Sequence, residues 1–565
     1  MKQRKKIPYG ISNFKSLVDE DYYFIDKTKY IEILENFNEK YLIFLRPRRF
    51  GKSLFLSMLE YYYDINYKDE KLFDEYYIGK NPTRLKNSYH TLSFTFSGIN
   101  TRTEENTLTG FNNNVAAAIE QFLNKNHLSF EFDYSQNAAD MLTRFFSKIT
   151  KYIKNKIYVL IDEYDHFANE LLGFQEDLFK TSVSQNGFVR KFYEVLKEET
   201  RTGLVDRIYI TGVSSITLDS MTSGFNIGKN ITRNHKLNEM LGFTRDEVIE
   251  LAKKTVGESF DVNKSIGNLA AYYNGYKFHV NGKERLFNSD MVLYYMSELQ
   301  QNGNEPEDYV DRNVVSDYSK IGKLFEVGGI DSNRMDVLKT LIRGEEIEVS
   351  LKEQLNLENE FTLDDFKSLL FYMGFITVKR MDRYNRTFYR VPNYVIKELY
   401  FEYFSKLIKD QTNYTIKPHE TSDAIIEVAE HGKINQLIKI TEETLHRLSN
   451  RDFIKFDEKY VKVILLTYLF KSKLYFCKSE YEVEDGYIDI VLLKGSSGDP
   501  KYFACLEIKY MSKKDFTEKL LQEKLEEAKE QLKKYSSSEE LKAIKNLKKF
   551  AIVFCYDECK AIEEF

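Results

Sequence analysis

Short apolar runs alternate with amphipathic segments along the first three hundred residues of the chain. Each run ends in polar residues or glycine, and the runs lie at 41–45, 91–96, 157–161 and 207–211. Segments with helical spacing fill the gaps, for example around 114–124 and 188–199. Buried strands separated by helices are typical of a parallel sheet. The pattern therefore predicts an α/β domain over residues 1–290.

The pattern changes after residue 290, where amphipathic helical segments such as 364–372 and 422–430 dominate. Within this region only one strand pair is predicted, between 375–378 and 387–391. Since no chemical signature accompanies these segments, we expect residues 291–450 to form a helical connector.

A third pattern begins near residue 451 and continues to the end of the chain. We predict a helix at 458–470, followed by strands around 475, at 488–493 and at 502–509. A second helix at 515–535 and a strand at 550–554 complete the order. The segment GSSGDP at 495–500 has the composition of a hairpin turn between two of these strands. Residues 451–565 are therefore expected to form a separate α/β domain.

Charge and cysteine content limit the class of protein and the cellular compartment that we expect. The 565 residues include 82 Lys and Arg against 87 Asp and Glu, a net charge of −5. This balance excludes a protein that binds nucleic acid over its whole surface, but it permits a local basic groove. Four cysteines without a CxxC pair argue against a disulfide framework. Because the apolar runs are also shorter than the ~18 residues of a membrane span, we expect a cytoplasmic protein with no membrane partner.

A phosphate-binding loop is indicated between the first strand and the helix after it. Strand 41–45 leads into RPRRFGKS, which includes Gly51, and a helical pattern begins at Leu54. In this layout Lys52 would reach the β- and γ-phosphates of ATP, and Ser53 would coordinate Mg²⁺. The helix N-terminus would favour the same anion.

Three arginines distinguish this loop from the general motif. Arg46 stands where the first glycine of G-x-x-x-x-G-K-[ST] is expected, and Arg48 and Arg49 add positive charge beside the phosphates. All three are candidate nucleotide contacts. Arg48 and Arg49 could instead pack against neighbouring acidic residues, and Gly-Lys-Ser at a helix start is often only a cap.

Two later strand ends complete the nucleotide-binding pattern. The run 157–161 is followed by Asp162 and Glu163, which would hold Mg²⁺ through water and polarise the attacking water. The next strand ends at Thr211, a residue suited to sensing the γ-phosphate. Taken alone, the acidic cluster DEYD could be a solvated loop. Because the carboxyl ends of parallel strands meet at one edge, the three strand ends together predict a site for ATP and Mg²⁺.

These motifs resemble a known family in their order along the chain. IPYGISNFKSLV, DKT at 26–28, RPRRFGKS, LIDEYD at 160–165, ITGVSS at 210–215 and YYNGYKF at 272–278 are similar to the AAA-ATPase-like family of many bacteria. The resemblance covers residues 4–290, and the family's glycine-poor loop accounts for Arg46. It implies an N-terminal P-loop ATPase domain and a C-terminal PD-(D/E)xK nuclease domain. It does not settle how fast such a loop hydrolyses ATP.

Two carboxylates and a lysine stand together in the C-terminal pattern. Glu507 and Lys509 are two apart on a predicted strand, so their side chains share one face. Asp489 lies on the preceding strand, within reach across the pair. Such a set can bind Mg²⁺ and orient water for attack on a phosphodiester. An isolated E-x-K pair, by contrast, is usually a surface ion-pair face.

The resemblance extends through this region, which it implies to be a restriction-endonuclease-like fold. Glu458 matches a glutamate that can complete the metal shell, and Gln531 with Tyr535 resembles the QxxxY element of recombination-type nucleases. Tyr487 stands where the family often has arginine after the glycine. This departure puts local substrate contacts in doubt and leaves the proposed metal ligands intact.

The sequence thus predicts an ATP-binding P-loop ATPase coupled to a Mg²⁺-dependent nuclease that acts on nucleic acid, with DNA as the expected substrate. The alternative is a nucleotide-switched binding or signalling protein whose nuclease fold holds nucleic acid without cutting it. The sequence leaves strandedness and oligomeric state open, and it permits a homo-oligomer.

Overall fold

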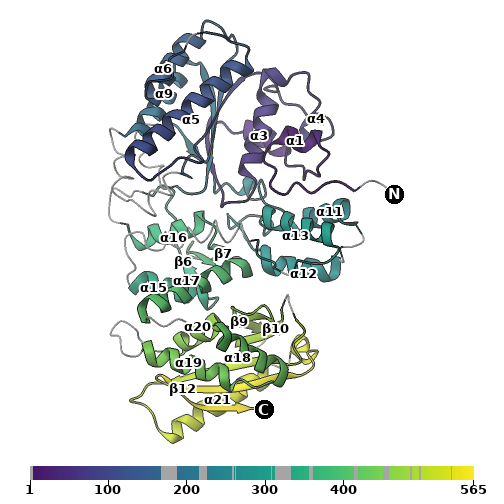
Figure 1. The fold of residues 1–565 in the computed structure, drawn as a ribbon, viewed down its shortest axis with the longest axis vertical. Helices are drawn as coiled ribbons and strands as arrows, with labels where there is room; N and C mark the ends of the chain where they lie inside the picture. Colours follow the sequence, from purple (N-terminus) through teal and green to yellow (C-terminus); the bar gives the residue numbers. More distant parts are fainter. Residues whose placement is uncertain are drawn as a thin grey trace. The chain divides into compact units, whose positions relative to one another are not determined.

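The chain folds into two compact units, whose elements can be followed in Figure 1. Unit 1 comprises residues 1–306, 310–330 and 348–393, and unit 2 comprises 307–309, 331–347 and 394–565. The region expected to be a separate connector is therefore divided between the two units. The computed structural model describes residues 4–130, 132–166, 187–215, 225–257, 260, 262–306, 308–311, 332–355, 361–412, 418–448, 457–483, 486–495, 498–535 and 538–565.

Unit 1 is built on a five-stranded parallel sheet with strand order β2-β3-β4-β1-β5. Its strands are β1 (Tyr41–Leu45), β2 (His90–Thr95), β3 (Ile157–Asp162), β4 (Val205–Gly212) and β5 (Lys229–Asn230). The register pairs Leu45 with Gly212, so β1 and β4 end at the same edge. The four predicted strands are confirmed, and only the two-residue β5 was not predicted.

Helices cover both faces of this sheet. In Figure 1, α5, α6 and α9 lie on one side, with α3 and α1 on the other. The helices of unit 1 are α1 (Phe14–Asp19), α2 (Lys29–Glu35), α3 (Lys52–Tyr63), α4 (Tyr77–Lys80), α5 (Glu104–Lys125), α6 (Ala138–Ile149), α9 (Phe188–Thr202), α11 (Arg245–Thr255), α12 (Val262–Tyr273), α13 (Ser289–Asn302) and α16 (Leu363–Tyr372), with 3₁₀ turns at Ile65–Tyr67 and His235–Leu237. The α/β fold class expected for this part is confirmed.

The helix after the phosphate-binding loop is fixed at its far end by a buried carboxylate. Asp64 follows α3, is fully buried, and accepts a hydrogen bond from the Thr91 amide on β2 at 3.0 Å. It also pairs with Lys125 on α5 at 2.8 Å. Burial alone would raise the pKa of Asp64, but Lys125 and the hydrogen bonds hold it below its ordinary value. The carboxylate thus joins α3 to β2 and α5.

A short antiparallel hairpin closes the part of unit 1 after residue 348. It consists of β7 (Thr377–Met381) and β8 (Thr387–Arg390), which confirms the predicted strand pair. The sheet has the order β6-β8-β7, with β6 at Ile347–Glu348. A hydrogen bond from the Val349 amide to the Thr387 carbonyl extends the contact between this segment and β8 just beyond β6.

Unit 2 contains a five-stranded mixed sheet with strand order β13-β12-β11-β10-β9. Only β11 and β12 are parallel. Its elements are α15 (Ser332–Ile342), α17 (Tyr394–Thr412), α18 (Pro418–His431), α19 (Asn435–Leu448), α20 (Glu458–Leu469), β9 (Tyr475–Val483), β10 (Gly486–Lys494), β11 (Phe503–Met511), α21 (Glu518–Tyr535), α22 (Glu539–Lys542), β12 (Leu547–Cys555) and β13 (Glu558–Glu564).

The sequence predicted this unit's helices and strands from α20 to β12, apart from the short α22, and missed β13. Residues 496–497 of the expected GSSGDP turn lie outside the described residues, although β10 and β11 are antiparallel, as that turn requires. The charged helix α21 buries the stripe Leu521, Leu525, Ala528 and Leu532, which faces the sheet.

In the described part of the chain, no helix is both long and apolar enough to cross a membrane. All four cysteines are free, and Cys477, Cys505 and Cys555 are buried.

We expect Asp64→Ala to lower the free energy of unfolding by about 3–5 kcal/mol, because it leaves the buried Lys125 ammonium with one fewer carboxylate partner. The measurement is urea unfolding of the full chain. Asp69→Ala removes an exposed acid a few residues away and serves as the control. Equal urea midpoints for both variants would show that the buried pair does not hold α3 in place.

Candidate functional site

The loop between β1 and α3 has the backbone of a phosphate-binding loop. Gly51 adopts φ 87°, a left-handed conformation that suits glycine, and it precedes the helix as its N-cap. No side chain caps this helix end, so its first backbone N–H groups face the loop. Helix N-termini of this kind attract anions. Arg49 also adopts a left-handed conformation, with φ 65°.

Lys52 is buried at the start of α3, as the motif requires. Its ammonium donates to the carbonyls of Arg46 at 3.0 Å and Pro47 at 2.9 Å, so it lies inside the curve of the loop. Burial lowers the pKa of Lys52, while the negative charges of Glu163 and Asp162 oppose that shift. The structure therefore brings the loop lysine and the two carboxylates that follow β3 into one electrostatic environment.

Asp162 at the end of β3 faces the start of α3. The Ser53 hydroxyl and the Glu163 amide, at 2.9 Å, both donate to its carboxylate. Burial and the nearby Glu163 charge raise the pKa of Asp162 despite these bonds. A hydroxyl and a carboxylate in contact are hard oxygen ligands of the kind Mg²⁺ prefers, so this donor set fits the ion. Glu163 adopts φ 49°, an uncommon conformation for a residue other than glycine.

Arg46 is a core residue, which corrects its assignment as a phosphate contact. Its guanidinium donates to the carbonyls of Leu45, Thr232 and Leu237 at 2.9–3.0 Å. It also lies over the rings of Phe44 and Phe278, at 4.3 and 3.9 Å from their centroids. Only 1% of Arg46 is exposed, so its side chain supports the loop from behind.

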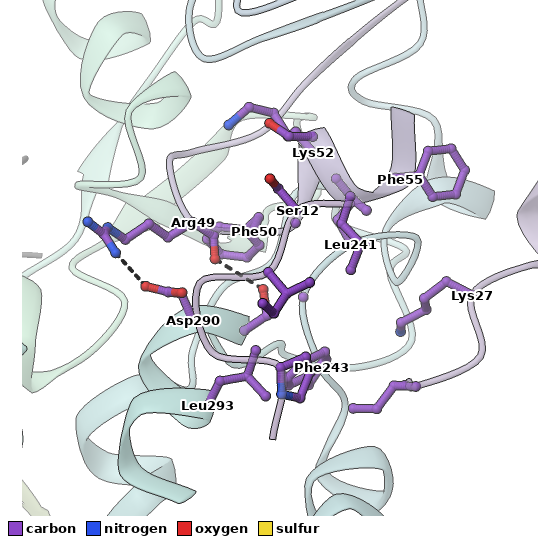
Figure 2. Close-up of a pocket in the computed structure, with 18 of the residues that line it drawn as sticks. Ser12, Lys27, Arg49, Phe50, Lys52, Phe55, Leu241, Phe243, Asp290 and Leu293 are labelled. Carbon is purple, nitrogen blue, oxygen red and sulfur yellow. Dashed lines mark hydrogen bonds and ion pairs between the residues drawn. The ribbon is translucent and has the colours of Figure 1, made fainter. Parts of the chain in front are cut away.

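The other two loop arginines line the cavity beside the loop. Arg49 pairs with Asp290 at the start of α13 at 2.5 Å, as Figure 2 shows. Its carbonyl accepts a hydrogen bond from the Ser289 hydroxyl at 3.0 Å. Arg49 thus makes the contact with an acidic neighbour that was the alternative to a nucleotide contact, and this ion pair ties α13 to the loop. Arg48 contributes its positive charge near Lys52.

Thr211 at the end of β4 also has a supporting position. Its hydroxyl donates to the Phe44 carbonyl at 2.9 Å, so it strengthens the contact between β4 and β1. The acidic residue that reaches the loop after β4 is Asp165, which accepts hydrogen bonds from Val213 and Ser214. A Cβ at Gly212 would lie 2.4 Å from an Asp165 oxygen, so this close approach requires glycine. The sequence showed Asp165 only as one member of an acidic cluster.

A cavity of about 400 Å³ opens beside the loop within unit 1. Figure 2 shows Lys52, Arg49 and Phe50 on one wall, with Leu241, Phe243 and Leu293 among the apolar residues around it. Pro8, Gly10, Ile11 and Ser12, from the IPYGISNFKSLV segment, also line it. A lining with both charged and apolar residues suits a nucleotide, whose phosphates are charged and whose base is largely apolar.

The DKT motif holds the wall of this cavity. Lys27 lines the cavity and donates to Glu247 at 2.7 Å and to the Glu239 carbonyl at 3.0 Å. Asp26 accepts a hydrogen bond from the Thr28 amide at 2.9 Å and from the Tyr77 amide at 2.7 Å. Asp26, just before α2, therefore holds this part of the chain against α4. Lys27 connects the backbone at residue 239 to Glu247 of α11. These roles could not be derived from spacing.

In unit 2 the structure brings Asp489, Glu507 and Lys509 together on adjacent strands. The Asp489 carboxylate accepts a hydrogen bond from the Ile508 amide at 2.7 Å. Glu507 pairs with Lys509 at 3.3 Å, and all three side chains are buried. Burial and the neighbouring Asp489 charge raise the pKa of Glu507 to about 8. The negative charge is concentrated where a cation would be stabilised.

A second lysine, which the sequence did not identify, contacts the same carboxylate. Lys462 on α20 pairs with Asp489 at 2.5 Å and also with Glu480. Although burial lowers it, these two carboxylates raise the pKa of Lys462 overall. Glu480 adopts φ 50° within β9. Lys462 lies one turn after Glu458, a spacing that places both on one helix face and that could have pointed to it.

The outer members of the pattern lie close to this cluster. Burial, then the Asp489 charge, raises the pKa of Glu458. Tyr535 of the QxxxY element packs on Gly486, where a Cβ would lie 2.6 Å from its ring. Gln531 has a buried side-chain oxygen, and Tyr487 is 53% exposed.

Among the described residues, no three His, Cys, Asp or Glu side chains meet as ready metal ligands. Asp489 and Glu507 alone nevertheless fit Mg²⁺, which is commonly held by one or two carboxylates together with water.

Comparisons with known proteins match the two regions of the chain that contain these residues. Residues 8–222 match the family model described as "Predicted AAA-ATPase", and residues 456–564 match that of the PD-(D/E)XK nuclease superfamily. An "Uncharacterized protein in vnfD 5'region" of Azotobacter chroococcum mcd 1 is 26% identical over 283 residues. This match spans 49% of the chain and 49% of that relative.

Solved structures show more distant similarity. The Aeropyrum pernix ORC1 protein in complex with DNA matches 70% of this chain and 98% of its own at 9% identity and a TM-score of 0.27. The ORC2 protein of the same organism, in ADPNP–ADP complexes, matches 67% and 93% at 10% identity and a TM-score of 0.27. Similarity at this level carries no conclusion about function. By the family matches, the chain combines a domain of the predicted AAA-ATPase family with a C-terminal domain of the PD-(D/E)XK nuclease superfamily.

Proposed function

We propose that the chain is an ATP-binding P-loop ATPase coupled to a Mg²⁺-dependent nuclease that cuts nucleic acid phosphodiesters. The observation that carries this proposal is the arrangement of Asp489, Glu507 and Lys509 on two adjacent strands of a nuclease-superfamily domain. We further propose the boundaries 1–290, 291–450 and 451–565 for the ATPase, connecting and nuclease regions.

In the ATPase domain, the nucleotide-binding residues are Gly51, Lys52, Ser53 and Asp162. The positive charge of Lys52 stabilises the β- and γ-phosphates, and Ser53 and Asp162 would hold Mg²⁺. Glu163 orients the attacking water as the general base. Arg48 and Arg49 add positive charge, whereas Arg46 and Thr211 act by holding the loop and the two strands in place.

In the nuclease domain, Asp489 and Glu507 are the metal-holding residues, with Glu458 as an additional ligand. Mg²⁺, when bound, would supply Lewis-acid stabilisation of charge on the phosphodiester. The Lys509 ammonium, 3.3 Å from Glu507, offers positive charge to the same group and can orient the attacking water. Burial and the neighbouring Asp489 charge raise the pKa of Glu507, and a bound cation would favour its charged form.

The second candidate is a nucleotide-switched binding protein whose nuclease fold does not cut. The ion pair between Lys462 and Asp489 favours it, because an ammonium already compensates the carboxylate that a metal would need. The experiments below separate the two candidates.

We expect Lys52→Met to weaken ATP binding by about 1.5–3 kcal/mol, roughly 10- to 150-fold, because the charge-assisted hydrogen bonds to the phosphates are lost. Isothermal titration calorimetry with ATP and Mg²⁺ measures the effect. Lys191→Met, an exposed lysine on α9, is the control. Unchanged affinity in Lys52→Met would remove the loop as the phosphate site.

We expect Asp489→Ala to abolish Mg²⁺-dependent cleavage, with a loss of at least about a hundredfold, because a metal-holding group is removed. The assay follows labelled single- and double-stranded DNA and RNA, with and without ATP. Asp499→Ala, near the start of β11, removes an exposed carboxylate as a control. Full activity in Asp489→Ala would refute the nuclease assignment, and inactivity of the wild type on every substrate would favour the non-cutting candidate.

Lys462→Met tests whether this lysine competes with a divalent cation for Asp489. Removing the competing ammonium should tighten Mn²⁺ binding about tenfold, equivalent to ~1.4 kcal/mol. Calorimetry and the Mn²⁺-induced rise in melting temperature both report it. Lys459→Met, on the exposed side of the same helix, is the matched control. Weaker Mn²⁺ binding in Lys462→Met would instead identify the lysine as a support for the site.

A further inference from the structure

The hairpin formed by β7 and β8 concentrates positive charge in a chain whose overall charge is negative. Residues 379–390 contain five basic side chains and one acidic side chain, Asp382. The tip is exposed, with Tyr384 64% and Met381 46% accessible to solvent. Hairpin 377–390 is therefore a basic and aromatic projection. The basic residues are Lys379, Arg380, Arg383, Arg386 and Arg390.

Its arginines are stacked on its aromatic rings. Arg380 lies over Phe388 at 4.0 Å and Arg383 over Tyr384 at 4.8 Å, measured to the ring centroids. Arg386 lies 5.8 Å from the Tyr384 ring. Stacking fixes the plane of a guanidinium while its N–H groups remain at the edge, where they can bind phosphate oxygens. The hairpin thus holds several cationic groups in defined orientations.

The turn at the tip is stabilised by a single carboxylate. Asp382 accepts hydrogen bonds from the amides of Tyr384 at 2.9 Å and Arg386 at 3.0 Å. It also accepts one from the Arg386 side chain at 2.8 Å. Asn385 adopts φ 62°, a conformation that asparagine tolerates in turns. These bonds set the shape of the tip before any partner binds, which lowers the entropy cost of binding.

The base of the hairpin is attached to the ATPase sheet region within unit 1. The Thr377 hydroxyl bonds with the backbone of Lys277 at 2.6 and 3.0 Å, and the Val378 amide donates to the Lys277 carbonyl. Just before β7, a Cβ at Gly374 would lie 2.8 Å from Pro47 of the phosphate-binding loop. The hairpin is therefore mounted on a rigid support next to the nucleotide site.

We propose that hairpin 377–390 is a contact for duplex DNA, with Arg380 and Arg383 on the phosphates and Tyr384 in a groove. A two-stranded ribbon fits the major groove of B-form DNA, whereas the deep, narrow major groove of A-form RNA does not admit one. Binding of single strands relies on several open rings for base stacking. Here Phe388 is covered by an arginine, and Tyr384 alone is largely exposed. The inference deepens the proposed function, since it rests on nucleic acid being the partner.

The test measures binding of a labelled 25-base-pair DNA duplex to the full chain by fluorescence anisotropy, in EDTA and over 50–200 mM salt. Arg380→Gln with Arg383→Gln should weaken binding about tenfold, and should reduce the slope of log affinity against log salt by roughly 1.8 for two lost phosphate contacts. Tyr384→Ala should weaken binding about threefold without changing that slope. Arg386 is left intact because it holds the turn.

The matched control is Lys151→Gln with Lys154→Gln, which removes the same amount of positive charge. Both residues are exposed and precede β3, at the opposite end of the parallel strands from the phosphate-binding loop. Circular dichroism and thermal melting confirm folding, and Arg383→Gln alone decides the result if the double variant fails to fold. The control should bind like the wild type.

Unchanged affinity and salt slope in the hairpin variants would overturn the proposal, as would a wild type that binds no duplex DNA. The proposal would also be overturned if the hairpin variants lost more affinity for an RNA duplex or for phosphatidylserine vesicles than for duplex DNA. Because cleavage is excluded in EDTA, these results are independent of the Asp489 assay. A chain that binds through the hairpin but never cuts would sink only the nuclease assignment.

Discussion

The nucleotide site depends on a buried arginine behind the phosphate-binding loop. Arg46 is enclosed by three backbone carbonyls and two aromatic rings, one of them Phe278 of the YYNGYKF segment. Phe50 of the loop packs edge-on against Tyr276 of the same segment. Burying a guanidinium is costly unless its N–H groups are hydrogen-bonded. In Arg46, Nη1 and Nη2 donate to carbonyls, whereas Nε has no hydrogen-bond partner among the described residues. The loop shape that places Lys52 is thus coupled to a segment more than two hundred residues later.

The nuclease site follows a different principle, in which several charges share one buried position. Burial, then the neighbouring Asp489 charge, raises the pKa of Glu507. Lys462 pairs with Asp489 and Lys509 with Glu507, and these pairs offset part of the repulsion between the two carboxylates. This arrangement of charges would attract a cation. The same set of residues is therefore compatible with both candidate functions, a nuclease that cuts nucleic acid and a protein that binds it without cutting.

Much of the fold could be predicted because the runs of apolar residues along the chain coincide with the segments that are buried in the structure. The parallel strands read as continuous apolar runs since both faces of that sheet are covered. Edge strands such as β5 and β13 were missed, because β5 has only two residues and four of the seven residues of β13 are charged. The hairpin 377–390 was predicted as a strand pair, but its stacked arginines depend on cross-strand neighbours.

The sequence by itself determined the two chemical patterns: a lysine and serine at a helix start with acids at the end of β3, and carboxylates on two adjacent strands with a lysine. These patterns survive because motif spacing fixes which residues share a strand end or a strand face. Only the tertiary structure decided that Arg46 and Thr211 support the site from behind and that Lys462 contacts Asp489. Spacing within one element cannot show which residues of other elements reach a charged side chain, because packing sets those contacts.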